Sequence, residues 1–407
     1  MTVEAADTSV FPRFLDLAYP NVERGSGVRL TLDDGREILD ACSGGAMVAS
    51  LGHGVREIVE AGAAQAEQLS YLYNHHFTNQ PQERLAERLL EVAAREMARV
   101  RFVSGGSEAN ETVLRLARQY HVDRGDADRW RMISPAQAYH GATMGALALV
   151  GRPALQRPFE GYLANHLHFD GTLAELDRVI EEAGPETIAA FVCEPISAAA
   201  RPAYSPPDEF WHGLAERRER HGFLVCFDEI VTGMGRTGSW FAYQQLPIEP
   251  DVVSAGKGMG AGYFPLAGVL CGQHVFDALA AGSREFEHGH TWDGAPLPCA
   301  VGLAVLGYLE SHRLVERVRE RGPSLRDELE AAVGGLPIAR EVRGRGFLLG
   351  VELEIDDPAR VDDTALAHGV LVTTSQNQTL LSPAFTSTDA ELAEMIERFA
   401  AALRELA

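Results

Sequence analysis

The sequence lacks any segment typical of secretion or of a membrane span. Its first ten residues, MTVEAADTSV, have neither a basic start nor an apolar core, so they do not form a signal peptide pattern. No apolar run approaches the length that a helix needs to cross a bilayer. Internal repeats and low-complexity runs are also missing. These absences predict a globular protein that stays in the cytoplasm.

Positive charge is scarce as well. Lys and Arg together number 36 against 58 Asp and Glu, which gives a net charge of −22 and argues against binding nucleic acid or an anionic membrane surface. The cysteines are few and show no metal or redox spacing, so we expect buried free thiols in a reducing compartment and no bound metal. The five cysteines are Cys42, Cys193, Cys226, Cys271 and Cys299.

One stretch, Phe227 to Gly262, carries the clearest chemical signal. Asp228 follows the apolar run LVCF, and Lys257 follows DVVSAG. Both runs read as buried strands of a parallel sheet, whose carboxyl ends face one crevice. An anion and a cation aimed at one pocket, with glycines beside the lysine, suggest a site for a ring-bearing cofactor. Taken alone, the two residues also fit a turn aspartate and a solvated surface charge.

The same stretch contains a pattern that imitates a dinucleotide site. Residues 233–238, GMGRTG, match G-x-G-x-x-G, and Asp251 lies near the distance expected for a ribose contact. A true site needs a helix directly after the glycines, whereas Ser239 and the aromatic residues beyond it follow here. The preceding strand also ends in Asp228 and Glu229, whose charge would repel a pyrophosphate. The sequence therefore argues against a dinucleotide site.

FDEIVTGMGRTG followed by PDVVSAGKGMGAGYFPLAGVL resembles the signature of the class III aminotransferases, which use pyridoxal 5'-phosphate (PLP). The resemblance runs from about Gly25 to the C-terminus and includes the omega-amino acid and amine:pyruvate types. It implies that Lys257 forms the Schiff base with PLP and that Asp228 pairs with the pyridinium nitrogen. The physical chemistry agrees, because desolvation favours the neutral amine that a nucleophile needs, and an ionised carboxylate keeps the ring nitrogen protonated.

Further cofactor contacts follow from the resemblance. A strand, the glycines at 105–106 and a helix start at Ser107 form a pattern typical of anion binding. The resemblance makes Gly106 and Ser107 the phosphate cradle, although relatives more often have serine where Gly105 stands. It also implies that Tyr139 stacks on the pyridine ring. The resemblance places His140 and Glu194 beside the cofactor and Ile230 on the opposite ring face.

The segment 288–292 predicts a contact between subunits. The resemblance implies that Thr291 reaches the phosphate bound to the neighbouring subunit, so we expect a homodimer with its active sites at the interface. A plain turn is the alternative for this segment. His288 and His290 could form a metal pair, but no third ligand is apparent.

The expected fold is α/β, of the PLP-transferase fold type I, with a mostly parallel seven-stranded sheet in a large domain and a smaller α+β domain. We assign residues 1–55 to an N-terminal segment that joins the small domain, 56–295 to the large PLP-binding domain and 296–407 to the small domain. The patterns predict helices over 55–69, 81–97 and 208–221, and strands over 101–104, 187–193, 223–227 and 370–373.

The substrate side departs from the family pattern. Many relatives hold a substrate carboxylate with an arginine where Leu380 stands here, and amine:pyruvate types use an arginine where this chain has Thr373. The glutamate that often masks the first arginine is replaced by Ala199. We therefore predict a substrate amine that is remote from its carboxylate or that lacks one. Arg201 and Arg152 are candidate replacement clamps, and both also fit ordinary surface charges.

The predicted activity is transfer of an amino group from an amine or amino acid to an oxo-acid acceptor, with Lys257 as proton carrier. The same apparatus supports decarboxylases, aminomutases and racemases, because the bond held perpendicular to the ring decides the outcome. A silent PLP-binding sensor is a further alternative from a different class of protein. Release of carbon dioxide, or product formed without an acceptor, would separate these outcomes from simple transfer.

Overall fold

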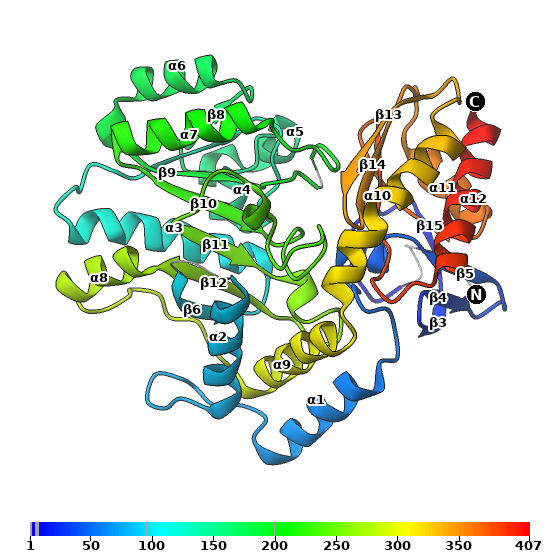
Figure 1. The fold of residues 1–407 in the computed structure, drawn as a ribbon, viewed down its shortest axis with the longest axis horizontal. Helices are drawn as coiled ribbons and strands as arrows, with labels where there is room; N and C mark the ends of the chain where they lie inside the picture. Colours follow the sequence, from blue (N-terminus) through cyan, green and yellow to red (C-terminus); the bar gives the residue numbers. More distant parts are fainter. Residues whose placement is uncertain (1, 5–7, 94–96, 199) are drawn as a thin grey trace.

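The computed structural model describes residues 2–4, 8–93, 97–198 and 200–407. A larger α/β part and a smaller α+β part lie side by side, with the larger part on the left in Figure 1. The larger part is built on one seven-stranded sheet. In spatial order its strands are β6 (Met97–Val103), β12 (Ala267–Gly272), β11 (Val252–Ala255), β10 (Leu224–Glu229), β9 (Ile188–Cys193), β7 (Arg131–Pro135) and β8 (Leu167–Phe169).

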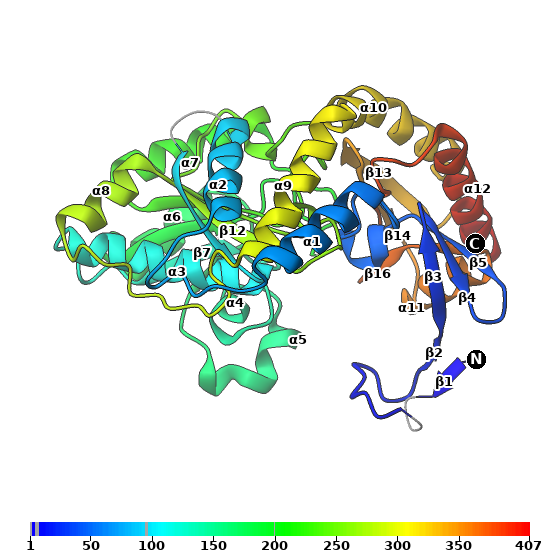
Figure 2. The same ribbon diagram turned by 90° about the horizontal axis from the view of Figure 1, so that it is seen from below.

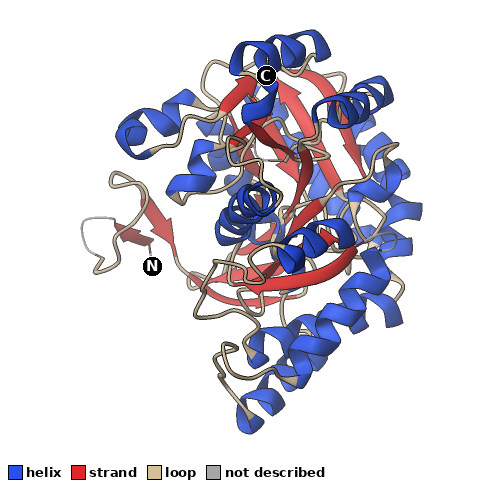
Figure 3. Cartoon of the chain, turned by 90° about the vertical axis from the view of Figure 1, so that its left-hand side faces the viewer, coloured by secondary structure: helices blue, strands red, loops and turns tan. Residues whose placement is uncertain are grey.

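The sheet is mostly parallel, as the sequence predicted. Only β12 runs against its two neighbours, β11 and β6, while the remaining pairs are parallel. The central strands are buried along their whole length, which explains their continuous apolar runs, because helices cover both faces. Figure 3 shows the helices flanking the strands. The helices of this part are α1 (Arg56–Gln68), α2 (Gln80–Ala93), α3 (Gly106–Asp123), α4 (Met144–Ala148), α5 (Pro153–Gln156), α6 (Leu173–Ala183), α7 (Asp208–His221) and α8 (Gln273–Ala281).

Alternation along β10 decides which residue faces which layer. Cys226 packs in the cluster that contains the buried face of α3, whereas Phe227 packs against Trp211 of α7 with ring centroids 5.6 Å apart. Successive side chains of a strand point to opposite faces. Asp228 therefore faces α3, and Glu229 faces the other layer.

The smaller part joins the two ends of the chain. One four-stranded sheet orders β15 (Val370–Leu371), β5 (Glu37–Asp40), β4 (Arg29–Leu32) and β3 (Val22–Ser26). A second orders β13 (Ala339–Arg345), β14 (Leu348–Leu353), β17 (Gln378–Leu381) and β16 (Thr373–Ser375). The helices here are α10 (Leu314–Val333), α11 (Ala359–Ala367) and α12 (Asp389–Leu406), while α9 (Pro296–Ser311) packs against α1 and α2. The short strands β1 (Thr2–Glu4) and β2 (Ala18–Pro20) project away from the body (Figure 2).

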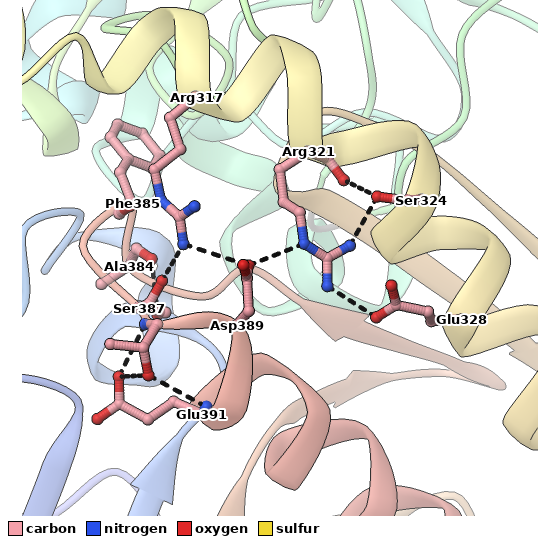
Figure 4. A network of polar contacts seen from close by, with 10 residues as sticks. Arg317, Arg321, Ser324, Glu328, Ala384, Phe385, Ser387, Asp389 and Glu391 are labelled. Atoms are coloured by element: carbon pink, nitrogen blue, oxygen red, sulfur yellow. Dashed lines mark hydrogen bonds and ion pairs between the residues drawn. The ribbon is translucent and has the colours of Figure 1, made fainter.

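Polar contacts fix the start of the last helix (Figure 4). Thr388 and Glu391 cap each other at the N-terminus of α12, a reciprocal pair that satisfies otherwise free backbone amides. Arg321 of α10 donates to Asp389 at 3.0 Å and so ties the two helices together. None of the described helices has both the length and the apolar character that a membrane span requires.

Three secondary-structure expectations were wrong in detail. The first strand of the large sheet begins at Met97 rather than Arg101, because its early residues pair with the end of β12. The helix expected over 81–97 ends at Ala93, and residues 94–96 lie outside the described part. The single strand expected over 370–373 is split, since Val370 pairs with Leu39 while Thr373 pairs with Leu380 in the other sheet.

Candidate functional site

Asp228 lies at the end of β10 with its carboxylate satisfied from three directions. Its Oδ1 accepts from the backbone amide of Ile230 at 3.0 Å. Its Oδ2 accepts from Asn110 Nδ2 at 2.7 Å and lies 2.8 Å from His140 Nδ1. Only 5% of the residue is exposed. The carboxylate is therefore held in one orientation by donors from three separate segments.

His140 has one partnered and one unpartnered ring nitrogen. Its Nδ1 faces Asp228, whereas Nε2 is buried and has no hydrogen-bond partner among the described groups. A neutral imidazole with its proton on Nδ1 fits both observations, because Nε2 then needs no acceptor. The ring donates to Asp228 in that state without adding a second buried charge.

Lys257 follows β11 directly and adopts a backbone conformation that few side chains tolerate. Its φ is +42°, in the left-handed region, at the start of a short 3₁₀ turn over Lys257–Met259. Desolvation lowers the pKa of its amine, while the negative charges of Asp228 and Glu194 act in the opposite direction. The neutral amine is thus more accessible than on a solvated lysine.

Ile230 packs between two glycines of the site. A Cβ added to Gly106 would lie 3.0 Å from the side chain of Ile230, and one added to Gly256 would lie 3.1 Å from it. Both contacts are tighter than ordinary van der Waals distances. The glycines therefore let the start of α3 and the segment before Lys257 approach the same side chain.

The start of α3 has free backbone donors. Gly105 occupies the cap position without a side-chain hydrogen bond, and no described group accepts from the amides of Gly106 and Ser107. The Ser107 hydroxyl accepts from the amide of Ala142 at 3.0 Å, and Gly141 approaches so closely that a Cβ would lie 2.5 Å from Ser107 Oγ. Unpaired amides at the positive end of an 18-residue helix suit a phosphate.

Glu194 connects the loop after β9 to Tyr139. Its carboxylate accepts from the amide of Ala198 at 3.0 Å, the amide of Tyr139 at 3.3 Å and the hydroxyl of Ser197 at 3.3 Å. Burial raises the pKa of Glu194, and the hydrogen bonds from the amides of Ala198 and Tyr139 oppose that effect. Tyr139 is 36% exposed, so its side chain is partly accessible to a ligand.

Thr291 does not join the other predicted residues within one chain. It lies on an exposed turn, and its carbonyl accepts from the hydroxyl of Tyr71 at 2.9 Å. His288 and His290 do not converge either, because His288 contacts Thr112 at 2.8 Å and His290 contacts Glu108 at 3.1 Å. In the described part of the chain, no group of three or more potential ligands is arranged around a metal position.

On the substrate side, the positions of the usual clamps hold no cation. Leu380 is buried, and the Thr373 hydroxyl donates to the carbonyl of Gly45 at 2.6 Å. Ala199 lies outside the described residues. Arg152 reaches Ser375 at 3.4 Å, whereas the guanidinium carbon of Arg201 lies 3.4 Å from the ring centroid of Tyr204.

Arg201 also lines a cavity of about 250 Å³. Glu194 and Ser197 border this cavity, and the rings of Phe191 and Phe210 form part of its wall. No described carboxylate forms an ion pair with Arg201. An unpaired guanidinium thus faces a space beside Glu194.

Sequence reasoning missed three features of the site. Lys257 is the only lysine among the 407 residues, a count that alone would have marked it. Asn110 is buried against Asp228, but a polar residue within a helical pattern gives no local signal. Arg236, inside the glycine-rich pattern, is buried between the two parts of the chain and donates to the carbonyls of Phe347 and Pro383. Burial lowers its pKa to about 9.

The residues present fit PLP. Free helix amides offer a phosphate site, Asp228 offers a fixed carboxylate, and a largely buried lysine with a lowered pKa offers the amine. Together with the seven-stranded sheet, they define a PLP-dependent transferase of fold type I.

Comparison with known proteins identifies the family. The family model described as aminotransferase class-III matches residues 15–403, and the chain belongs to that family. It is 33% identical to an uncharacterized aminotransferase of Bacillus subtilis, over 95% of each chain. It is 36% identical to a probable aminotransferase of Mycobacterium tuberculosis, over 84% of this chain and 77% of the relative.

Solved structures agree with this membership. An (S)-enantioselective omega-transaminase from Thermomicrobium roseum superposes with a TM-score of 0.93 at 32% identity, over 99% of this chain and 97% of that one. The omega-transaminase from Pseudomonas jessenii in complex with PMP gives a TM-score of 0.91 at 30% identity, over 96% and 93%. The chain is thus an aminotransferase that uses pyridoxal phosphate.

Proposed function

We propose that Lys257 holds the coenzyme covalently and carries the proton during transfer of an amino group between an amine or amino acid and an oxo acid. The observation that supports this role most directly is the position of the only lysine, held at φ +42° at the end of β11 beside the charge of Asp228. When bound, the coenzyme supplies a ring that accepts electrons from the substrate carbon.

The described contacts support a division of labour among the other residues. Asp228 keeps the ring nitrogen protonated, and His140 orients that carboxylate. The amides of Gly106 and Ser107 bind the phosphate. Tyr139 covers one face of the ring, with Ile230 on the other, and Glu194 positions Tyr139 through its backbone amide.

The lowered pKa of Lys257 supports its role as base and acid. A desolvated amine loses its proton at a lower pH, so a larger fraction is neutral and able to accept a proton from the substrate carbon at Nζ. Asp228 and Glu194 limit this effect and favour the ammonium form that returns the proton. Opposed influences of this kind suit a group that must both accept and donate.

We further propose a cytoplasmic homodimer in which Thr291 serves the phosphate of the partner subunit. An exposed aromatic cluster supports an interface at this turn: Tyr71 and Trp292 pack edge to face at 5.3 Å, and Phe77 is 65% exposed. All five cysteines are free, which fits a reducing compartment.

For the substrate, the clamp positions support an amine without a carboxylate at the usual site. Leu380 and Thr373 cannot pair with a carboxylate. Arg201 is a better replacement clamp than Arg152, because its guanidinium has no described side-chain acceptor and borders the cavity beside Glu194. Several solved relatives are named amine or omega-transaminases, which is consistent with such a donor.

The test uses the fact that the chain has one lysine. Borohydride reduction in the presence of PLP should attach one pyridoxyl group at Lys257, as read by intact and peptide mass spectrometry. Lys257→Ala should lose this label and the visible absorbance of the bound coenzyme, and turnover should fall by about 10⁴-fold or more. Lys257→Arg is the matched control: it retains the positive charge but cannot form the bond, so it should fail equally.

Retained labelling and turnover in Lys257→Ala would refute the assignment. Recovery of activity in Lys257→Arg would show that charge rather than the amine is required. Coupled measurement of carbon dioxide and of product without an oxo acid separates amino transfer from decarboxylation, mutase or racemase outcomes.

A further inference from the structure

Asn110 contacts Asp228, and both the nitrogen and the oxygen of its side-chain amide form hydrogen bonds. It is 1% exposed and lies on α3, three residues after Ser107. Its Nδ2 donates to Asp228 Oδ2 at 2.7 Å and to the carbonyl of His140 at 2.6 Å. Its Oδ1 accepts from the hydroxyl of Ser254 at 3.0 Å. The amide thus connects two residues of the candidate site, Asp228 and His140, to Ser254 on β11.

Ser254 supplies the donor to the oxygen of the Asn110 amide. It lies on β11, directly opposite Asp228 in the register of β10 and β11, and three residues before Lys257. If the amide turned over, its oxygen would face two groups that only accept, the Asp228 carboxylate and the His140 carbonyl. These acceptors therefore fix the orientation in which a donor points at the carboxylate, and the Ser254 hydroxyl stabilises it by donating to Oδ1.

We propose that Asn110 is a positioning residue that sets the ionisation of the coenzyme ring through Asp228, and that Ser254 supports it by donating to its amide oxygen. The proposal rests on the proposed pairing of Asp228 with the ring nitrogen. A charge-assisted donor stabilises the ionised carboxylate and restricts its rotation, and a fixed anion holds the ring proton to a higher pH.

The location on α3 adds a geometric consequence. The amides of Gly106 and Ser107 lie at the start of the same helix, about 4.5 to 6 Å along the axis from Asn110 at 1.5 Å per residue. A single stiff element thus positions both the proposed phosphate site and the partner of the ring nitrogen. A substitution at Asn110 is expected to affect the ring end and to leave the phosphate end in place.

The experiment follows the ring nitrogen directly. Wild type, Asn110→Ala and Ser254→Ala are reconstituted with PLP labelled with ¹⁵N in the ring, and the nitrogen resonance is followed as the pH is raised. In Asn110→Ala the midpoint for loss of the ring proton should fall by about one pH unit, and PLP should bind about tenfold more weakly. Ser254→Ala should shift the midpoint in the same direction by a smaller amount.

Ser134→Ala is the matched control. Ser134 is a fully buried serine on β7 that donates to Leu149, and none of its described contacts involves Asp228 or Lys257. It should lower stability without moving the midpoint. An unchanged midpoint in both Asn110→Ala and Ser254→Ala would overturn the proposal, as would an equal shift in Ser134→Ala.

Two further outcomes are decisive. If Asn110→Ala does not fold, Ser254→Ala alone decides, since it retains the amide and removes one hydroxyl. If Asp228→Asn leaves the midpoint unchanged, the pairing of Asp228 with the ring is wrong and the proposed site fails with this inference. A shift in Asp228→Asn without one in the other two variants overturns only the role of Asn110.

Discussion

Asp228 and Glu229 are consecutive carboxylates at the end of β10, yet they face opposite sides of the sheet. Both are buried, with exposures of 5% and 0%, and both accept several hydrogen bonds. Asp228 faces α3 and receives donors from separate segments of the chain. Glu229 faces the other layer, and its donors in the described part of the chain come from the segment that follows it, namely Thr232, Ala242 and Tyr243 at 2.7 to 2.8 Å.

The difference shows that the sheet face to which a side chain points can decide its role. One carboxylate is available to a ligand site, and the other stabilises the fold. The Glu229 carboxylate accepts hydrogen bonds from the segment that follows it and so stabilises the local backbone. Because the side chain is fully buried, it is not accessible to a ligand. Asp228, on β10, accepts from Asn110 of α3 and from Ile230, and its Oδ2 lies 2.8 Å from His140 Nδ1. Fixing a carboxylate from several segments in this way is what a preorganised site needs. Burial raises the pKa of Glu229 to about 7 despite its donors.

Between these two carboxylates, the larger expected effect on activity comes from removing the charge of Asp228. Asp228→Asn preserves the shape but cannot stabilise a protonated ring nitrogen, so kcat/KM should fall by about 10² to 10³-fold. The melting temperature should also fall modestly, because the amide NH₂ of the variant must face one of the buried donors that the carboxylate accepted from. Steady-state kinetics with one amine donor, together with calorimetry, check both parts. Nearly normal turnover would contradict the pairing of Asp228 with the ring.

Glu229→Ala should give the opposite pattern. It leaves the amides of Ala242 and Tyr243 buried without acceptors and creates a cavity, so the free energy of unfolding should fall by about 4 kcal/mol. Turnover per folded molecule should stay within a few fold of wild type. Urea titration and active-site counting by PLP absorbance separate the two effects. A loss of turnover comparable to that of Asp228→Asn would show that Glu229 is also required for catalysis and is not only a structural residue.

The sequence predicted the parts of this comparison that depend on local pattern. Continuous apolar runs indicated the strands β9, β10 and β11, because parallel strands that are buried on both faces need such residues. Those strands then placed Asp228 and Lys257 near one edge of the sheet.

The remaining features depend on contacts between distant residues. Asn110 meets Asp228 across 118 positions and Ser254 across 144, and nothing in its own helix marks it. The division of residues 370–375 between two sheets depends on Leu39, a partner from the other end of the chain. Arg236 looked like part of a glycine-rich loop, and only the assembled fold shows it stacked on Phe385 and buried.

The smallest effect is the pH dependence of stability that Glu229 contributes. Its pKa rises from 4.5 to about 7 on folding, so the folded state binds the extra proton between these values. Stability from this group is therefore fully present below about pH 4.5 and is lost as the pH rises through about 7, a change of about 3 kcal/mol.

Glu229→Gln cannot titrate and should lack this change. The difference in unfolding free energy between Glu229→Gln and wild type should move in favour of the variant by about 3 kcal/mol between pH 4.5 and pH 8. Urea midpoints at these two values measure it, and differencing against wild type cancels the titration of all other groups. A pH-independent difference would mean that Glu229 is ionised throughout. Its three donors would then outweigh burial, and the contrast with Asp228 would lie only in where the donors originate.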